Sequence, residues 1–166
     1  MDSDPVFDDG DLDADLMIVG EAPGQQERRL GRPFCGQCGK LLDKILKEVV
    51  GLDRNQIYVS NTVHCGMLEN RKPYPEEIGA CRPYLIEEIE IVSPKCLLIL
   101  GQTAITGLLF EDERVSKVGG NWYKYGEIVA MPSFHPAYIL RSVRYLPKME
   151  QDFRKVRKFL ESGKID

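Results

Sequence analysis

The sequence lacks any apolar run long enough to cross a membrane, because no stretch approaches the roughly 20 consecutive apolar residues that a transmembrane helix needs. It also lacks the basic N-terminus of a secretory signal and the arginine-rich start of a transit peptide. Neither a Gly-x-Gly-x-x-Gly fingerprint nor a P-loop lysine is present, which disfavours an open-sheet nucleotide-binding protein. These absences predict a cytoplasmic protein with no membrane partner.

Positive charge is absent from the N-terminus, where residues 1–15 hold seven aspartates and neither lysine nor arginine. The net charge of −4 therefore hides a slightly basic remainder. Residues 141–164 carry eight basic and three acidic side chains, a pattern that fits either a face that binds phosphates or a solvated amphipathic helix. We expect residues 1–15 to form an acidic, partly mobile leader and residues 16–166 to form a single domain.

Continuous apolar segments alternate with amphipathic ones along the chain. Buried strands are predicted at 16–20, 57–61, 96–101 and 128–133, with a shorter strand at 122–125. Helices are predicted at 36–50, 75–92, 103–109 and 146–160. Pro83 should kink or split the second of these helices. The alternation predicts an α/β protein, a three-layer sandwich in which helices flank a central four-stranded parallel sheet.

Unusual polar residues follow three of the predicted strands, and the carboxyl ends of parallel strands are where such sheets bind ligands. Glu21, Asn61 and His135 stand at or just after the ends of these strands. A carboxamide can donate to and accept from the imide edge of a pyrimidine, and an aromatic ring such as Phe34 can stack on its face. Each residue alone also fits an ordinary structural role, but together they suit a flat, polar heterocycle.

Four segments, in order, resemble the motifs of the family 4 (iron–sulfur) uracil-DNA glycosylases. They are Gly20-Glu21-Ala22-Pro23-Gly24-Gln25-Gln26-Glu27, Gly31-Arg32-Pro33-Phe34, Asn61-Thr62-Val63-His64-Cys65 and Phe134-His135-Pro136-Ala137-Tyr138-Ile139-Leu140-Arg141. The resemblance implies the uracil-DNA glycosylase-like fold and a base-excision repair enzyme that flips uracil out of DNA and hydrolyses its N-glycosidic bond. No lysine stands in a recognisable Schiff-base position, so we expect a monofunctional enzyme that leaves an abasic site.

The resemblance also implies roles for the matched residues. The implied substrate-binding residues are Gly20, Ala22, Glu27, Phe34 and Asn61. Among them, Asn61 reads the imide edge, Phe34 stacks on uracil, and Glu27 fills the space near C5 and helps to exclude thymine. The implied catalytic residues are Glu21, Asn61 and His135. The loop of Glu21 holds the attacking water, and His135 stabilises the charge on the departing uracil oxygen.

Contacts with DNA are implied for the last motif. The residues concerned are Ala137, Ile139, Leu140 and Arg141, with the apolar pair acting as a wedge that enters the minor groove. Ala137 stands where serine is usual in the family, which removes one expected phosphate contact. The expected partner is uracil-containing DNA, and we expect a monomer. Two other functions stay open: a non-catalytic DNA-binding relative of the phage-polymerase-associated type, and a glycosylase for another deaminated base such as hypoxanthine.

Five cysteines raise the question of a metal. Cys65 and Cys81 have the spacing of two cluster ligands in the resembled family, whose other two ligands form a Cys-x-x-Cys pair before the first strand. Here such a pair occurs later, as Cys35 and Cys38. The four thiolates could hold a structural [4Fe–4S] cluster, they could hold zinc, or the protein could bind no metal. Cys96 lies in a predicted strand and is expected to be a small core residue.

Overall fold

The computed structural model describes residues 4–165 and contains a six-stranded sheet in the order β1-β3-β2-β4-β6-β5. The strands are β1 (Asp9–Gly10), β2 (Leu16–Gly20), β3 (Tyr58–Asn61), β4 (Cys96–Leu100), β5 (Tyr123–Tyr125) and β6 (Ile128–Ser133). The four central strands are parallel, and β1 and β5 pair antiparallel at the edges. The predicted parallel sheet is therefore confirmed, and two short edge strands extend it.

Seven α-helices lie in the described residues. They are α1 (Gln25–Leu30), α2 (Gln37–Ile45), α3 (Pro75–Val92), α4 (Gln102–Leu108), α5 (Val115–Val118), α6 (Pro136–Arg141) and α7 (Leu146–Ser162). A π-helical turn at Leu46–Val50 prolongs α2, and 3-10 turns occupy Arg54–Gln56, Leu68–Asn70 and Val143–Tyr145. The expected split at Pro83 is wrong, because α3 runs unbroken past it. Pro83 is exposed, so the carbonyl group left without its helical hydrogen bond can face solvent.

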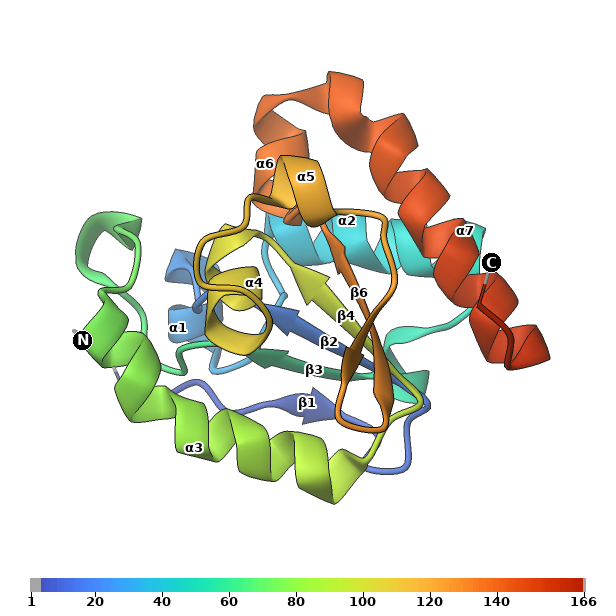
Figure 1. Ribbon diagram of the computed structural model, residues 1–166. Helices are drawn as coiled ribbons and strands as arrows, with labels where there is room; N and C mark the ends of the chain where they lie inside the picture. Colours follow the sequence, from blue (N-terminus) through green and yellow to red (C-terminus); the bar gives the residue numbers. More distant parts are fainter. Residues whose placement is uncertain (1–3, 166) are drawn as a thin grey trace.

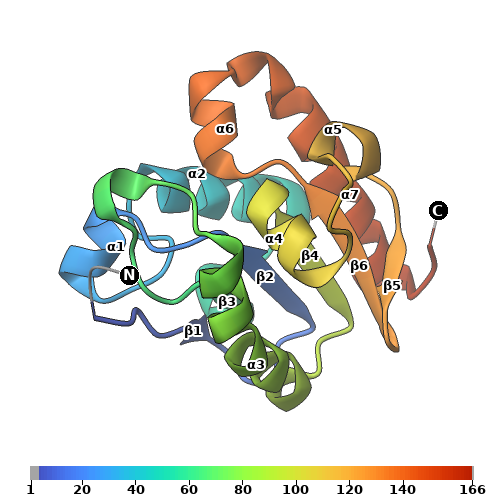
Figure 2. The same cartoon turned by 60° about the vertical axis from the view of Figure 1, so that its left-hand side comes forward.

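Helices cover both faces of the sheet, as Figures 1 and 2 show. Leu16 and Ile18 of β2 pack into a core with α2, α6 and α7. The intervening residues Met17 and Val19 pack into a second core with α3 and α4. This alternation follows from the two-residue side-chain period of a strand, and it produces the predicted three layers.

β3 lies next to β2 along one edge of that strand, and β4, which follows β3 in the chain, lies along the opposite edge of β2. The crossover connections therefore diverge between β2 and β4. At such a switch point the loops that leave the two strands separate and open a crevice, where ligands of open α/β sheets bind. The topology thus predicts a ligand-binding site at the carboxyl ends of β2, β3, β4 and β6.

The acidic leader lies against the domain over its described part, residues 4–15. Val6 is buried, and its backbone N–H donates to the carbonyl of His64 at 2.8 Å. Next along the chain, β1 pairs with β3. The expected partial mobility of residues 1–15 stays a prediction, and residues 1–3 lie outside the described residues. No helix within 4–165 combines the length and apolarity required to span a membrane.

Candidate active site

A cavity of about 630 Å³ opens at the carboxyl ends of the parallel strands. Glu27, Phe34, Asn61 and His135 all line it, although the chain separates the first from the last by more than a hundred residues. They come from α1, the turn before α2, the end of β3 and the turn after β6. Glu21, Ala22, Ala137 and Arg141 also line this cavity. The structure therefore brings together the side chains that the sequence analysis selected separately.

Asn61 ends β3 opposite Gly20 of β2, and its side chain is 4% exposed. A Cβ atom on Gly20 would lie 2.5 Å from the Phe34 ring and 2.8 Å from Asn61 Oδ1. Only glycine at this position lets the two side chains approach the strand end. Within residues 4–165 the carboxamide of Asn61 has no hydrogen-bond partner. A buried amide with unused donors and acceptors at a cavity wall is suited to bind a polar ligand.

Phe34 provides an aromatic surface in the same cavity. Its ring is 5% exposed and stacks on the imidazole of His135, with centroids 5.8 Å apart and planes inclined by 28°. The backbone of Phe34 has φ of +49°, in the left-handed region that side chains other than glycine rarely adopt. The ring is therefore placed by an unusual turn rather than by a regular element.

Glu27 is fixed at the cavity wall by the start of α2. Its Oε1 atom accepts hydrogen bonds from the backbone N–H groups of Cys35 (3.2 Å) and Gly36 (3.0 Å). These are free donors at a helix N-terminus, where a carboxylate is favoured by charge. Because the carboxylate is held on both N–H groups and is 8% exposed, its position is defined before any ligand enters.

His135 is the N-cap of α6, and its Nδ1 atom accepts a hydrogen bond from the backbone N–H of Ala137 at 3.1 Å. Nδ1 therefore carries no proton, and in the neutral ring the proton resides on Nε2. Burial, followed by the charge of Arg141, lowers the pKa of His135 to about 4. Near neutral pH this residue is an uncharged N–H donor in the cavity.

Glu21 connects the two strands that flank the switch point. Its carboxylate accepts a hydrogen bond from the hydroxyl of Thr103, the second residue of α4. Its backbone carbonyl accepts from the N–H of Val63 at 3.0 Å, after β3. Three strand-end loops thus meet at Glu21, so its carboxylate faces the cavity in a defined orientation.

Cationic side chains form the rim of the cavity: Arg71, Lys72, Arg114 and Arg141. Arg114 was not predicted from the sequence, because it lies in a charged loop that gives no recognisable signal. Gln102 fixes this loop, because its Nε2 donates to the carbonyl of Glu113 at 2.6 Å and its Oε1 accepts from the N–H of Val115 at 3.0 Å. The amide thereby holds the backbone on both sides of Arg114.

The residues predicted to contact DNA divide into two groups. Ala137 and Arg141 line the cavity, and Leu140 is 49% exposed beside it. Ile139 is only 2% exposed and belongs to the core, so its predicted entry into the minor groove is wrong. The segment is the helix α6 and not a loop, and a helix turns successive side chains by about 100°, which sends Ile139 inward. Val143, which is 70% exposed, was not anticipated.

The four cysteines proposed as metal ligands do not come together within residues 4–165. Cys65 and Cys81 pack in one small cluster, and burial followed by the neighbouring Cys81 raises the pKa of Cys65. Cys35 and Cys38 lie near Glu27 instead, where burial and then that carboxylate raise the pKa of both thiols. The prediction of one four-cysteine site, for a cluster or for zinc, is therefore wrong. The reason is topological, since α2 and α3 cover opposite faces of the sheet.

Within the same residues a different group could hold a metal ion: the ligand atoms of Asp8, His64 and Glu88 lie within 4.8 Å of one another. His64 Nε2 lies 2.6 Å from Glu88 Oε1 and 3.4 Å from Asp8 Oδ1. Burial would lower the pKa of His64, but the hydrogen bonds and charges of the two carboxylates raise it to about 11. We interpret the group as an ionic triad that joins the leader, the loop after β3 and α3.

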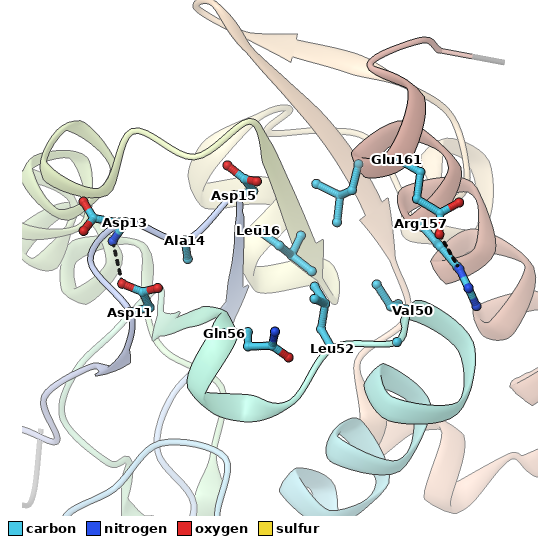
Figure 3. A pocket seen from close by; sticks show the side chains of 12 residues that line it. Asp11, Asp13, Ala14, Asp15, Leu16, Val50, Leu52, Gln56, Arg157 and Glu161 are labelled. Carbon is cyan, nitrogen blue, oxygen red and sulfur yellow. Dashed lines mark hydrogen bonds and ion pairs between the residues drawn. The ribbon is translucent and has the colours of Figure 1, made fainter.

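A second cavity, of about 500 Å³, lies at the opposite end of β2 (Figure 3). Its charged walls come from the segment before β2 and from α7: Asp11, Asp13, Asp15, Arg157 and Glu161. Arg157 is paired there with Glu161 at 2.9 Å. None of the residues selected from the sequence faces this cavity, and it lies away from the carboxyl ends of the parallel strands. The first cavity is therefore the candidate functional site.

Comparison with known proteins connects this geometry to one family. Residues 7–161 match the sequence model described as the uracil DNA glycosylase superfamily. The chain is 41% identical over 153 residues to a type-4 uracil-DNA glycosylase of Sulfurisphaera tokodaii, covering 87% of this chain and 69% of that protein. It is 40% identical over 141 residues to the type-4 uracil-DNA glycosylase of Thermotoga maritima, covering 82% and 72%. It is also 31% identical over 150 residues to a DNA polymerase of Bacillus phage SP01, covering 90% of this chain and 16% of the polymerase.

Proposed function

The chain belongs to the uracil-DNA glycosylase superfamily, and from this premise we propose that it removes uracil from DNA in base-excision repair. The substrate is a deoxyuridine flipped out of the duplex, because the bond to be cut is shielded inside the stack. The products are free uracil and an abasic site. The observation that carries the proposal is the shared cavity of Glu27, Phe34, Asn61 and His135.

Each of these side chains offers what a uracil ring requires. The unpartnered carboxamide of Asn61 can donate to a uracil carbonyl and accept from the imide N–H at once. Phe34 supplies a stacking face. The fixed side chain of Glu27 fills the space near C5 of the ring, so it leaves no room for the extra methyl group of thymine. The combination favours a pyrimidine with a free imide edge over other flat heterocycles.

The reaction needs stabilisation of a leaving anion more than a strong nucleophile. As the C1′–N1 bond breaks, the sugar acquires oxocarbenium character and the bonding electrons move onto uracil. The neutral Nε2–H of His135 donates a hydrogen bond to the uracil oxygen where this negative charge develops. The imidazole does not have to be protonated before it can donate. Water held near Glu21 then bonds to C1′ through its oxygen, and the proton that it loses ends on the departing uracil anion, so neutral uracil leaves. No covalent enzyme intermediate is required, so the enzyme is monofunctional.

The rim cations bind the DNA backbone on either side of the flipped nucleotide. Lys72, Arg114 and Arg141 supply positive charge next to the cavity, and phosphate contacts of this kind position the duplex without reading its sequence. The exposed side chains of Leu140 and Val143 form the apolar wedge in place of Ile139. They fill the gap that the extruded base leaves in the stack.

A [4Fe–4S] cluster, which the family resemblance implies, requires four thiolates at one point. Within residues 4–165 no three of the cysteines bring their thiol groups to one point, so the described residues do not fit a complete cluster. No step of the proposed excision runs through a cluster. The visible spectrum of anaerobically purified protein tests this point, because thiolate-bound iron absorbs near roughly 400 nm. The predictions of a cytoplasmic and monomeric protein stay predictions.

The decisive experiment is a cleavage assay on duplexes that differ at one base. A duplex with a single uracil should give alkali-labile breaks, and the matched duplex with thymine should give none. The assay should include U·G and U·A pairs and single-stranded DNA. If none of these uracil substrates is cut, the proposed activity is wrong.

The phage polymerase relative supports one other candidate, a DNA-binding module without excision activity. The similarity covers 90% of this chain but only 16% of the polymerase, so a single domain of this kind also occurs within a larger DNA-handling protein. DNA binding without base release, on uracil and on a panel that includes hypoxanthine, would favour this candidate. Release of hypoxanthine alone would instead indicate a glycosylase for another deaminated base.

A further inference from the structure

The proposed stacking residue sits in a conformation that its own chemistry disfavours. Phe34 has φ of +49°, in the left-handed region where a Cβ atom crowds the following carbonyl group. Such a conformation persists only when the surrounding structure holds it, and it is enriched at functional sites. The side chain that holds this turn belongs to a residue outside the cavity.

Arg54 binds the backbone of the turn with two arms of its guanidinium group. Its Nη1 donates to the carbonyl of Pro33 at 3.2 Å, and its Nη2 donates to the carbonyl of Phe34. The guanidinium carbon also lies 6.0 Å from the centre of the Phe34 ring, within the range of a cation–π contact. One cation therefore holds both carbonyl groups on either side of the Phe34 Cα atom.

Two neighbours complete the support. Asp43 of α2 accepts a hydrogen bond from Arg54 Nε at 2.9 Å, which orients the planar guanidinium toward the turn. Gly39, also in α2, allows the carbonyl of Phe34 to pack directly against the helix, because a Cβ atom there would lie 1.7 Å from that oxygen. The turn is thus clamped between an arginine on one side and a helix backbone on the other.

We propose that Arg54 is a positioning residue for the excision reaction, and that it acts by holding Phe34 in the conformation that presents its ring to uracil. This inference rests on the proposed function. Arg54 does not line the cavity and does not touch the reacting atoms. Its side chain is 16% exposed and reaches the site only through Phe34 and its turn, by the two carbonyl groups and the ring. Lysine cannot replace it, because a single ammonium group lacks the planar fork that binds two carbonyls at once.

The test is a double-mutant cycle of Arg54→Ala and Phe34→Ala, measured as single-turnover excision and as inhibition by free uracil. In the wild-type background Arg54→Ala should lower the single-turnover excision rate by about 10- to 100-fold, the effect expected of a misplaced substrate contact. It should weaken uracil inhibition as well. In the Phe34→Ala background the same change should have less than about a threefold effect, because the ring through which Arg54 acts is already gone.

Arg157→Ala is the matched control. Arg157 also pairs with a carboxylate through Nε (2.9 Å, Glu161) and donates to a backbone carbonyl (3.4 Å, Val49), but it lies at the second cavity (Figure 3). Arg157→Ala should leave the single-turnover excision rate unchanged. Arg54→Lys should resemble Arg54→Ala in rate while keeping its charge, and millimolar guanidinium should partly restore Arg54→Ala but not Phe34→Ala.

An equal loss from Arg54→Ala in both backgrounds would overturn the inference, since the residue would then act without Phe34. A rate unchanged by Arg54→Ala would do the same. The chemical shift of the Phe34 Cα atom, compared between wild type and Arg54→Lys, reports the turn without any activity. If wild-type protein fails to excise uracil, the proposed function is lost. The Cα chemical shift of Phe34 still decides whether Arg54 holds the turn. If Arg54 does so, this shift should differ between the wild type and Arg54→Lys.

Discussion

The protonation state of His135 gives the sharpest prediction about the reaction. Burial and the charge of Arg141 lower its pKa to about 4, whereas an exposed imidazole titrates near 6.5. At pH 5.5 about 3% of such a residue is protonated, against roughly 90% of an unperturbed one. Because the neutral ring is the donor that the reaction uses, we expect excision to show no loss from His135 protonation between pH 8 and pH 5.5.

The assay is the single-turnover rate against pH, together with the nitrogen-detected NMR titration of the imidazoles. The chain has only two histidines, so a His135→Gln variant assigns both signals. The rate and the His135 signal should stay constant to pH 5.5 and change together near pH 4. A midpoint between pH 6 and pH 7 in both measurements would refute the reasoning about burial and tautomer.

The size of the contribution follows from the role assigned to Nε2–H. Removing a donor to a developing oxyanion costs on the order of 10²- to 10³-fold in rate, equivalent to about 2.7–4 kcal/mol, and His135→Ala, which leaves no side-chain donor, should lose this amount. Arg141→Ala should raise the pKa of His135, because the charge that helps to depress it is removed. Stability has the corresponding sign: the unfolded chain binds the His135 proton more tightly, so the fold loses stability as pH falls from 6.5 toward 4.

Asn61→Ala should lower single-turnover excision by about 10²-fold or more, because the imide edge loses its partner, whereas the exposed Asn121→Ala should match wild type. Ile139→Ala should lower the free energy of unfolding by about 2–5 kcal/mol, as expected of a core residue, and denaturant melts measure it. Leu140→Ala should change stability by less than about 0.5 kcal/mol and should slow excision from duplex more than from single-stranded DNA; equal losses on both substrates would contradict the wedge. Arg114→Ala should reduce the salt dependence of DNA affinity by about one phosphate contact, and an unchanged salt slope would exclude that contact.

The sequence carries most of the information about the fold and the identity of the site. Continuous apolar segments predict the parallel strands, because a strand that is covered on both faces carries apolar side chains at successive positions rather than at alternate ones. The residues that follow those strands, among them Asn61 and His135, could then be assigned to one edge of the sheet without coordinates. The family resemblance of these segments supplied the substrate class.

Only the tertiary structure decided where the individual side chains of the motifs point. Ile139 and Leu140 are adjacent and chemically alike, and the formation of α6 is what buries one and exposes the other. The spacing of Cys35 and Cys38 suits a metal site, but the sheet lies between the helix that they begin and the helix that carries Cys81.

The support of the Phe34 turn by Arg54 was equally absent from the sequence pattern. Residue type and order fix which elements form, because these depend on local periodicity and burial. Which side chains meet depends on contacts between distant segments, and a single chain shows these contacts only when folded.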